Sequence, residues 1–305
     1  MSAVLKFGGT SLINAGAFRA VANIIKNENS PVVILSAIHN VTNQLNKLFY
    51  YSDMQNMDAI NTCITDIGKK HNKIMDDLSI ESKIKHEANH LLDNKLNSST
   101  GLLHDIIKYP NHVETQYLKQ NVMVTGEQIS CLIMDNYLKL QNIHSQKVEG
   151  SKLFLCNHII NPYPCDISTL SIKRMISPII TKNNIPLIEG YHGRDRHDNI
   201  ITFGRNGSDL TATFIADSLN INRVKIYKVE IDEMDAWKEG YVGVIDEEGN
   251  TISELLFDDA MTIAKSNRNV LSYSMLRPLI NNRKIIIEIK NTMQPNLNGT
   301  KIIRK

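Results

Sequence analysis

The sequence lacks the features of an exported or membrane-bound protein. It has four cysteines in 305 residues, Cys63, Cys131, Cys156 and Cys165, and no CxxC pair, so free thiols are expected rather than a disulfide scaffold. No apolar run approaches the roughly 18 residues of a membrane-spanning helix, and no hydrophobic leader precedes the first strand-like segment. These absences predict a cytoplasmic protein without membrane contact.

A charge excess of either sign is also missing. The chain has 34 Lys and Arg against 32 Asp and Glu, for a formal net charge of +2. A balance this close to neutral gives no reason to expect nucleic acid as a partner. Apolar residues make up 42% of the chain, which is enough for one large domain or two packed lobes.

Hydrophobic periodicity predicts an α/β fold. Residues 4–7 and 32–36 have the pattern of buried strands, and residues 14–28 between them have helical spacing. Strand, helix and strand at this pitch indicate a parallel sheet. Residues 41–120 are polar with helical spacing, so a helical subdomain outside the sheet is expected. Helices are predicted at 126–140 and from Ser208, and strands at 185–191, 199–204, 224–231 and 284–290.

Glycine-containing turns follow strands or begin helices at four places. They are KFGGTS (6–11), TGE (125–127), GYHG (190–193) and GRNGSD (204–209). At the carboxyl edge of a parallel sheet, glycines let backbone N–H groups approach an oxyanion, and a helix N-terminus adds positive potential. The turns therefore predict a phosphate-handling site. They match neither GxxxxGK[ST] nor GxGxxG, so neither a P-loop nor a Rossmann site is indicated.

Five segments resemble the aspartate kinases of the amino-acid kinase superfamily. They are VLKFGGTSL, VILSAIHNVTNQL, TGEQIS, FGRNGSDLTATFIA and NTMQPNLNGTKI, and they occur in the family's order. The resemblance implies the amino-acid kinase fold, an open α/β/α sandwich around a mostly parallel sheet. It implies one domain over 1–305, with a substrate lobe over about 1–200 and a nucleotide lobe over about 201–305.

The resemblance also implies a reaction, the transfer of the γ-phosphoryl group of ATP to the β-carboxylate of L-aspartate with Mg²⁺ as cofactor. Lys6, Gly8 and Gly9 would contact the transferring phosphoryl group, and Asp209 would orient Lys6 or the substrate amine. Glu127 would meet the α-ammonium group and Arg205 would clamp a carboxylate. The remaining implied substrate contacts are Thr10, Ser36, Thr42, Tyr191, Gly207 and Ser208. The implied nucleotide contacts are Lys6, Gly9, Tyr227, Lys228 and Asn269.

The chain departs from the family pattern mainly on the nucleotide side. The family's Asp-Pro-Arg segment is absent, Asn269 stands where the family has lysine, and Asn206 stands where it has glycine. Two alternatives therefore stay open, a kinase for another carboxylate-bearing amino acid and a non-catalytic amino-acid-binding protein. The chain ends at Lys305, so no ACT regulatory domain is expected, and a homodimer is left open.

One further motif is typical of a different class of enzyme. His86-Glu87-Ala88-Asn89-His90 matches HExxH, the pattern of zinc hydrolases. It lies in a Lys-rich helical segment, away from the predicted kinase edge and with no clear third ligand. We therefore expect a solvated helix and no metal site of the protein's own.

Overall fold

The structure is a computed structural model that describes residues 2–112, 114–157, 159–229, 243–246, 248–265, 271–282 and 284–304. Its centre is an eight-stranded sheet in the order β3-β4-β2-β1-β7-β9-β10-β8. Neighbouring strands are parallel except β9 and β10. The strands are β1 (Val4–Phe7), β2 (Val32–Leu35), β3 (Ser145–Val148), β4 (Ile185–Glu189), β7 (Arg223–Lys228), β8 (Glu254–Leu256), β9 (Ile286–Asn291) and β10 (Thr300–Ile303). The predicted mostly parallel α/β sheet is confirmed.

The central strands are buried on both faces. Every residue of β1 and β2 is buried, as expected for apolar strands, interrupted here only by Lys6, in a sheet covered on both sides. Alternate side chains enter two different cores: Leu5 and Phe7 of β1 join one cluster, and Val4 joins the other. This alternation is the period of two of a strand, and it makes the sheet the middle layer of a sandwich.

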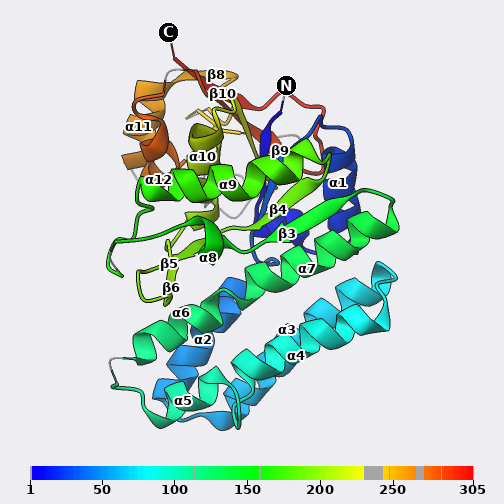
Figure 1. Cartoon of the computed structure of the whole chain (residues 1–305), viewed down its shortest axis with the longest axis vertical. Helices are drawn as coiled ribbons and strands as arrows, with labels where there is room; N and C mark the ends of the chain where they lie inside the picture. The colour runs from blue at the N-terminus through cyan, green and yellow to red at the C-terminus, as the bar shows by residue number, and fades with distance from the viewer. Residues whose placement is uncertain are drawn as a thin grey trace.

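Helices cover both faces of the sheet (Figure 1). On one face, α7 (Thr125–Leu140) packs on β2, β3 and β4, and α1 (Ala15–Lys26) packs beside α7 in the same buried cluster. On the other face lie α8 (Gly150–Leu153), α9 (Ile167–Thr181), α10 (Gly207–Leu219), α11 (Phe257–Lys265) and α12 (Tyr273–Leu276). Helix α10 is buried along almost its whole length, because it lies between the sheet and α9 and α12. The arrangement is the predicted α/β/α sandwich.

The helical segment predicted over 41–120 is present. It consists of α2 (Val41–Asp53), α3 (Met57–Asp77), α4 (Ser82–Leu96), α5 (Leu102–Lys108) and α6 (Thr115–Met123). In Figure 1 these helices form the end of the molecule opposite the two chain termini. Their apolar sides belong to the same buried cluster as α1 and α7, so the subdomain extends one core of the sandwich.

Residues 199–204 contain a predicted strand that does not join the main sheet. Strand β6 (Ile200–Thr202) pairs antiparallel with β5 (His192–Arg194) in a separate hairpin. The hairpin connects the end of β4 to the beginning of α10. Two short 3₁₀ helices, η1 (Gly9–Leu12) and η2 (Arg277–Leu279), complete the described elements. Within the described ranges, the helices are too short or too polar to cross a bilayer.

Candidate active site

The loops that follow β1, β2 and β4 meet at one edge of the sheet. Backbone hydrogen bonds tie each loop to its neighbour: Gly8 N donates to Tyr227 O at 3.1 Å, and Ser36 N donates to Phe7 O at 3.2 Å. Gly190 N, after β4, donates to Leu35 O at 3.1 Å. These strands are parallel, so their carboxyl ends form a continuous ledge, the usual ligand position in an open α/β sheet.

Two lysines and one aspartate form a buried ionic cluster on this ledge. Asp209, in the first turn of α10, has its Oδ1 2.7 Å from Lys6 Nζ and its Oδ2 3.1 Å from Lys228 Nζ. All three side chains are more than nine-tenths buried. Burial alone would raise the pKa of Asp209, but the ammonium groups of Lys228 and Lys6 outweigh it and hold that pKa below its ordinary value. The cluster carries two positive charges against one negative charge.

The loop after β1 places backbone beside this cluster. A Cβ on Gly8 would lie 3.6 Å from Lys6 Nζ, so the Gly8 backbone passes close to the ammonium group. A Cβ on Gly9 would lie 3.1 Å from Ala37 O, which leaves little room for any side chain there. The loop is held by Ser11, whose Oγ donates to Tyr227 O at 3.1 Å and lies 2.6 Å from Thr292 Oγ1. The backbone is thus fixed against the two lysines.

A buried carboxyl group with one oxygen that has no partner among the described residues lies on the β2 side of the edge. Glu127, in the first turn of α7, accepts a hydrogen bond on Oε1 from Ala37 N at 3.1 Å. Its Oε2 is buried and has no hydrogen-bond partner among the described residues. Burial is the main cause that raises the pKa of Glu127 to about 8. A buried carboxyl in this state would gain strongly from a cationic ligand.

Close packing around α7 explains the small residues near Glu127. A Cβ on Gly126 would lie 2.5 Å from the Ala37 Cβ, so only glycine fits at that point. Ser130 Oγ, one turn further along α7, donates to Ser36 O at 2.6 Å. Helix α7 is therefore locked against the loop after β2, and this contact determines where the Glu127 carboxyl lies.

The GRNGSD turn leads directly into α10. Gly204 has φ +71° and Asn206, the N-cap residue, has φ +61°, a left-handed region that asparagine tolerates better than most residues. A Cβ on Gly207 would meet Tyr191 Cδ2 at 3.1 Å, and one on Gly190 would meet Ser208 Oγ at 2.6 Å. The turn therefore packs tightly against the loop after β4. Arg205 is exposed beside it.

The other predicted site residues have different surroundings. Thr10 Oγ1 is buried and has no hydrogen-bond partner among the described residues. Thr42 is half-buried in the first turn of α2, and Tyr191 has φ +79° and donates its backbone N–H to Thr211 Oγ1 at 3.2 Å. The Tyr227 ring is stacked on Phe7, with ring centroids 4.9 Å apart, so its backbone carbonyl rather than its ring faces the loop after β1.

Some predictions lie beyond what the structure describes or away from the ledge. Asn269 lies outside the described residues. His86, Glu87 and His90 of the HExxH match are exposed on α4. In the described ranges, no group of three or more His, Cys, Asp or Glu side chains is placed to hold a metal ion.

A second buried polar group was not predicted from the sequence. Glu189, the last residue of β4, has its Oε2 3.6 Å from His192 Nε2, and both side chains are essentially inaccessible. Burial raises the pKa of Glu189 to about 7 and lowers that of His192 to about 4. The only signal was a glutamate at the end of an otherwise apolar strand, IPLIE. Thr292, which bonds Ser11, was missed likewise, although it follows a strand at the same edge.

The ledge combines groups that suit an anionic ligand with a group that suits a cationic one. Two ammonium groups, a glycine-containing backbone loop and the N-terminus of α10 suit an anion. The spare oxygen of Glu127 suits a cation. One ligand with a cationic amine and anionic groups, together with a phosphate, would satisfy all of these groups at once.

Comparisons with known proteins agree with this arrangement. The family model of the amino acid kinase family matches residues 1–288. Aspartokinase 2 of Arabidopsis thaliana, a chloroplastic protein, is 26% identical over 321 residues, which cover 100% of this chain and 55% of that protein. The lysine-sensitive aspartokinase 3 of Escherichia coli is 23% identical over 308 residues, covering 99% of this chain and 64% of that protein. The chain thus spans roughly half to two thirds of these relatives.

Solved structures show the same fold. Escherichia coli aspartokinase III in complex with aspartate and ADP superimposes with a TM-score of 0.86 at 22% identity, covering 100% of this chain and 65% of that chain. Clostridium acetobutylicum aspartate kinase superimposes with a TM-score of 0.71 at 19% identity and covers 99% of this chain. The sequence match, the sandwich and the charged ledge lead to one conclusion: the chain belongs to the amino acid kinase family.

Proposed function

We propose that this chain is the catalytic unit of an aspartate kinase. It transfers the γ-phosphoryl group of ATP to the β-carboxylate of L-aspartate and yields aspartyl phosphate and ADP. The observation that carries the proposal is the buried Lys6–Asp209–Lys228 cluster beside the Gly8–Gly9 backbone. The relatives named aspartokinase, and the structure solved with aspartate and ADP, favour this substrate pair.

The substrate side accounts for the spare polar groups of the ledge. Glu127 pairs its free Oε2 with the α-ammonium group of aspartate, and Arg205 clamps a substrate carboxylate through two parallel N–H groups. Ser36, Thr42, Thr10, Ser208, Gly207 and Tyr191 line the same space. The β-carboxylate is already ionised and nucleophilic at neutral pH, so the reaction needs no general base from the protein.

Charge neutralisation is the main task of the remaining residues. Lys6 and the Gly9 N–H contact the phosphoryl group during its transfer, when negative charge is spread over its oxygens. The Gly8 N–H already donates to Tyr227 O, so Gly8 holds the loop beside the Lys6 ammonium group and does not make the N–H contact that the resemblance implies. Asp209 does not react. It holds the Lys6 and Lys228 ammonium groups at fixed positions, so that little reorganisation is needed when the phosphates arrive.

The donor side uses the other part of the chain. We propose a substrate lobe over about 1–200, including the helical subdomain, and a nucleotide lobe over about 201–305. Lys228 contacts the donor phosphates, the Tyr227 carbonyl supports the loop that holds them, and Asn269 belongs to the same side. Mg²⁺ supplies further charge neutralisation when it enters with the nucleotide. Because the described residues offer no cluster of three metal-binding side chains, its ligands would be mainly phosphate oxygens and water.

The four cysteines are free thiols, which supports a reducing compartment and a cytoplasmic location. Assembly as a homodimer belongs to the same proposal and is checked by sedimentation at several protein concentrations.

The test is calorimetric titration of ATP with Mg²⁺ into the protein, with and without saturating L-aspartate, followed by a panel of carboxylate-bearing amino acids. Binding of ATP together with turnover specific to aspartate is the expected result. Turnover with another amino acid, and none with aspartate, would assign a different substrate. Aspartate binding without any nucleotide binding would mean that the chain is an amino-acid-binding protein and not a kinase.

A further inference from the structure

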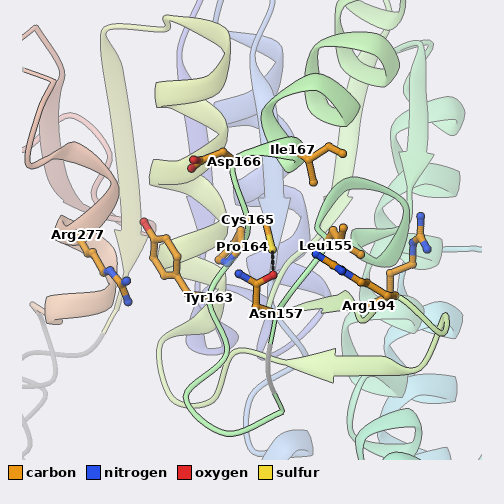
Figure 2. A pocket seen from close by; sticks show the side chains of 10 residues that line it. Leu155, Asn157, Tyr163, Pro164, Cys165, Asp166, Ile167, Arg194 and Arg277 are labelled. Atoms are coloured by element: carbon orange, nitrogen blue, oxygen red, sulfur yellow. Dashed lines mark hydrogen bonds between the residues drawn. The ribbon is translucent and has the colours of Figure 1, made fainter.

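A large cavity lies away from the proposed active site. It has a volume of about 810 Å³ and is formed where the loop before α9 approaches the β5–β6 hairpin and η2 (Figure 2). None of the predicted substrate or nucleotide residues lines it. Its volume is in the range of small-molecule binding sites, which is roughly 300–1,000 Å³.

The lining of this cavity has an excess of positive charge. Arg194, Arg196 and Arg277 line it, and Asp166 is the one acid among the lining residues. Arg194 also pairs with Asp198 on the hairpin. Among the lining residues together with Asp198, three positive charges stand against two negative charges, and the neighbouring carboxylates of Asp195 and Asp217 do not line the cavity. Guanidinium groups stay charged at every physiological pH, so the excess is permanent.

The arginines are placed for a ligand with more than one anionic group. The Arg277 guanidinium lies over the Tyr163 ring, 3.7 Å from its centroid. Stacking engages the flat face of a guanidinium, whereas its N–H donors lie in the plane of the group. Figure 2 shows Arg277 and Arg194 on opposite sides of Tyr163 and Asn157. A ligand that contacts both guanidinium groups must therefore span the cavity.

Tyr163 gives the cavity a firm aromatic wall. Its ring meets Phe214 of α10 edge-on, with centroids 6.1 Å apart. Burial is the main cause that raises the pKa of Tyr163 to about 12, so its phenol stays neutral and remains able to donate a hydrogen bond to an anion. The wall is continuous with α10, whose first turn carries Asp209 of the active site.

We propose that this cavity binds a small molecule with two or more carboxylate or phosphate groups, held between Arg277 and Arg194. The site goes beyond the kinase activity and does not depend on it. Arg196, a third lining guanidinium at an exposed position, adds long-range attraction, and Tyr163 forms the aromatic wall beside the ligand.

Cys165 provides a local readout of this site. It lines the cavity, and its Sγ donates to Asn157 Oδ1 at 2.8 Å. The other three cysteines are buried, so a small alkylating reagent acts selectively on Cys165 in the folded protein. Burial raises the pKa of the Cys165 thiol, which makes the reaction slow enough to follow by peptide mass spectrometry at mildly alkaline pH.

The experiment measures the rate at which iodoacetamide alkylates Cys165 in the presence of citrate, pyrophosphate or glycerol at matched ionic strength. At an anion concentration ten times its Kd, occupancy should slow the reaction on the order of tenfold, while glycerol has no effect. Whichever anion protects at the lower concentration identifies carboxylate or phosphate as the preferred group. The protection should disappear in Arg194→Gln/Arg277→Gln and persist in the matched control Arg174→Gln, which changes an exposed arginine of α9 outside the cavity.

Thermal unfolding verifies that the double variant is folded. If it is not, Arg196→Gln, at an exposed position, takes its place and should raise the anion concentration needed for half protection. Absence of protection by both anions in the wild-type chain would overturn the proposal, and so would full protection in the folded double variant. Neither result bears on the kinase reaction, because the readout is confined to Cys165.

Discussion

Asp209 Oδ1 lies 2.7 Å from Lys6 Nζ, and both side chains are buried. Lys6 comes from the first strand of the sheet and Asp209 from the first turn of α10, so the contact joins two parts of the chain that are about two hundred residues apart. The pair fixes an ammonium group at the carboxyl edge of the sheet, where the proposed phosphoryl transfer takes place.

Lys6→Ala should reduce kcat by at least about 100-fold, because the ammonium group neutralises charge that develops on the transferring phosphoryl group. Steady-state kinetics with ATP and aspartate measure the effect. Lys26→Ala, at the exposed end of α1, and His90→Ala, in the exposed HExxH match, are the controls and should keep wild-type turnover. A Lys6→Ala enzyme with near-normal kcat would remove Lys6 from the mechanism.

Asp209→Asn should destabilise the protein by about 3–5 kcal/mol, because two buried ammonium groups lose their shared counter-charge. Chemical denaturation measures the free energy of unfolding. Adding Lys228→Met should recover part of this loss by removing one of the unpaired charges. If the double variant is as unstable as the sum of the two single variants, the ionic cluster is not a coupled unit.

Binding of aspartate should release a proton at neutral pH. The pKa of Glu127 in the free protein is raised to about 8, mainly by burial, so the carboxyl is largely protonated at pH 7. Pairing with an ammonium group requires the carboxylate, and the proton must therefore leave. Proton release should be close to one per aspartate at pH 7 and should fall towards zero as the pH rises well above 8.

Calorimetry in buffers with different ionisation enthalpies counts these protons. Glu127→Gln, which cannot ionise, should bind aspartate more weakly and should release none. Binding by the wild-type chain at pH 7 without proton release would mean that another group receives the substrate amine.

Arg205→Lys should raise the KM for aspartate by roughly 10-fold or more, because lysine keeps the charge but cannot form two parallel hydrogen bonds to a carboxylate. The KM for ATP should change little. Arg174→Lys on α9 is the matched control. An unchanged KM for aspartate in Arg205→Lys would place the carboxylate elsewhere in the site.

Two glycine-to-alanine changes should act in opposite directions. A Cβ on Gly190 would lie 2.6 Å from Ser208 Oγ, so Gly190→Ala must displace the first turn of α10 and should lower both stability and activity. Gly68 lies inside α3, and apart from the backbone of its own helix no atom lies within 4 Å of an added Cβ. Gly68→Ala should therefore stabilise the protein by about 0.5–1 kcal/mol. Thermal unfolding measures the two opposite changes in stability. An unchanged unfolding temperature in Gly190→Ala would argue against the tight contact between Gly190 and Ser208.

The sequence predicts the centre of this fold better than its edges. Strand β2 is an uninterrupted apolar run and β1 is interrupted only by Lys6, and short buried runs of this kind predict central strands of a parallel sheet. Strands β3 and β8 contain three or four residues of mixed polarity, and they form because neighbours already in the sheet offer hydrogen-bonding groups. Strand β6 was correctly predicted as a strand, but its pairing with β5 depends on chain geometry beyond any local pattern.

The same distinction applies to the site. Lys6, Glu127 and Asp209 lie in motifs and were predicted as neighbours of one ligand site. Their mutual contacts depend on three-dimensional packing. Lys228 meets Asp209 because β7 returns to the sheet beside the first turn of α10. Glu189 and His192 are three residues apart but meet because the chain turns sharply between β4 and β5. Neither contact follows from a spacing pattern in the sequence.

The most direct test of the proposed reaction is to trap its product. Aspartyl phosphate is an acyl phosphate, and hydroxylamine converts it to a hydroxamate that is measured by its coloured iron complex. Incubation of the purified chain with ATP, Mg²⁺, L-aspartate and hydroxylamine should give hydroxamate in proportion to ADP, and Lys6→Ala should give none. ATP consumption without hydroxamate, or no reaction at protein concentrations where both ligands bind, would contradict the assignment of aspartate kinase activity.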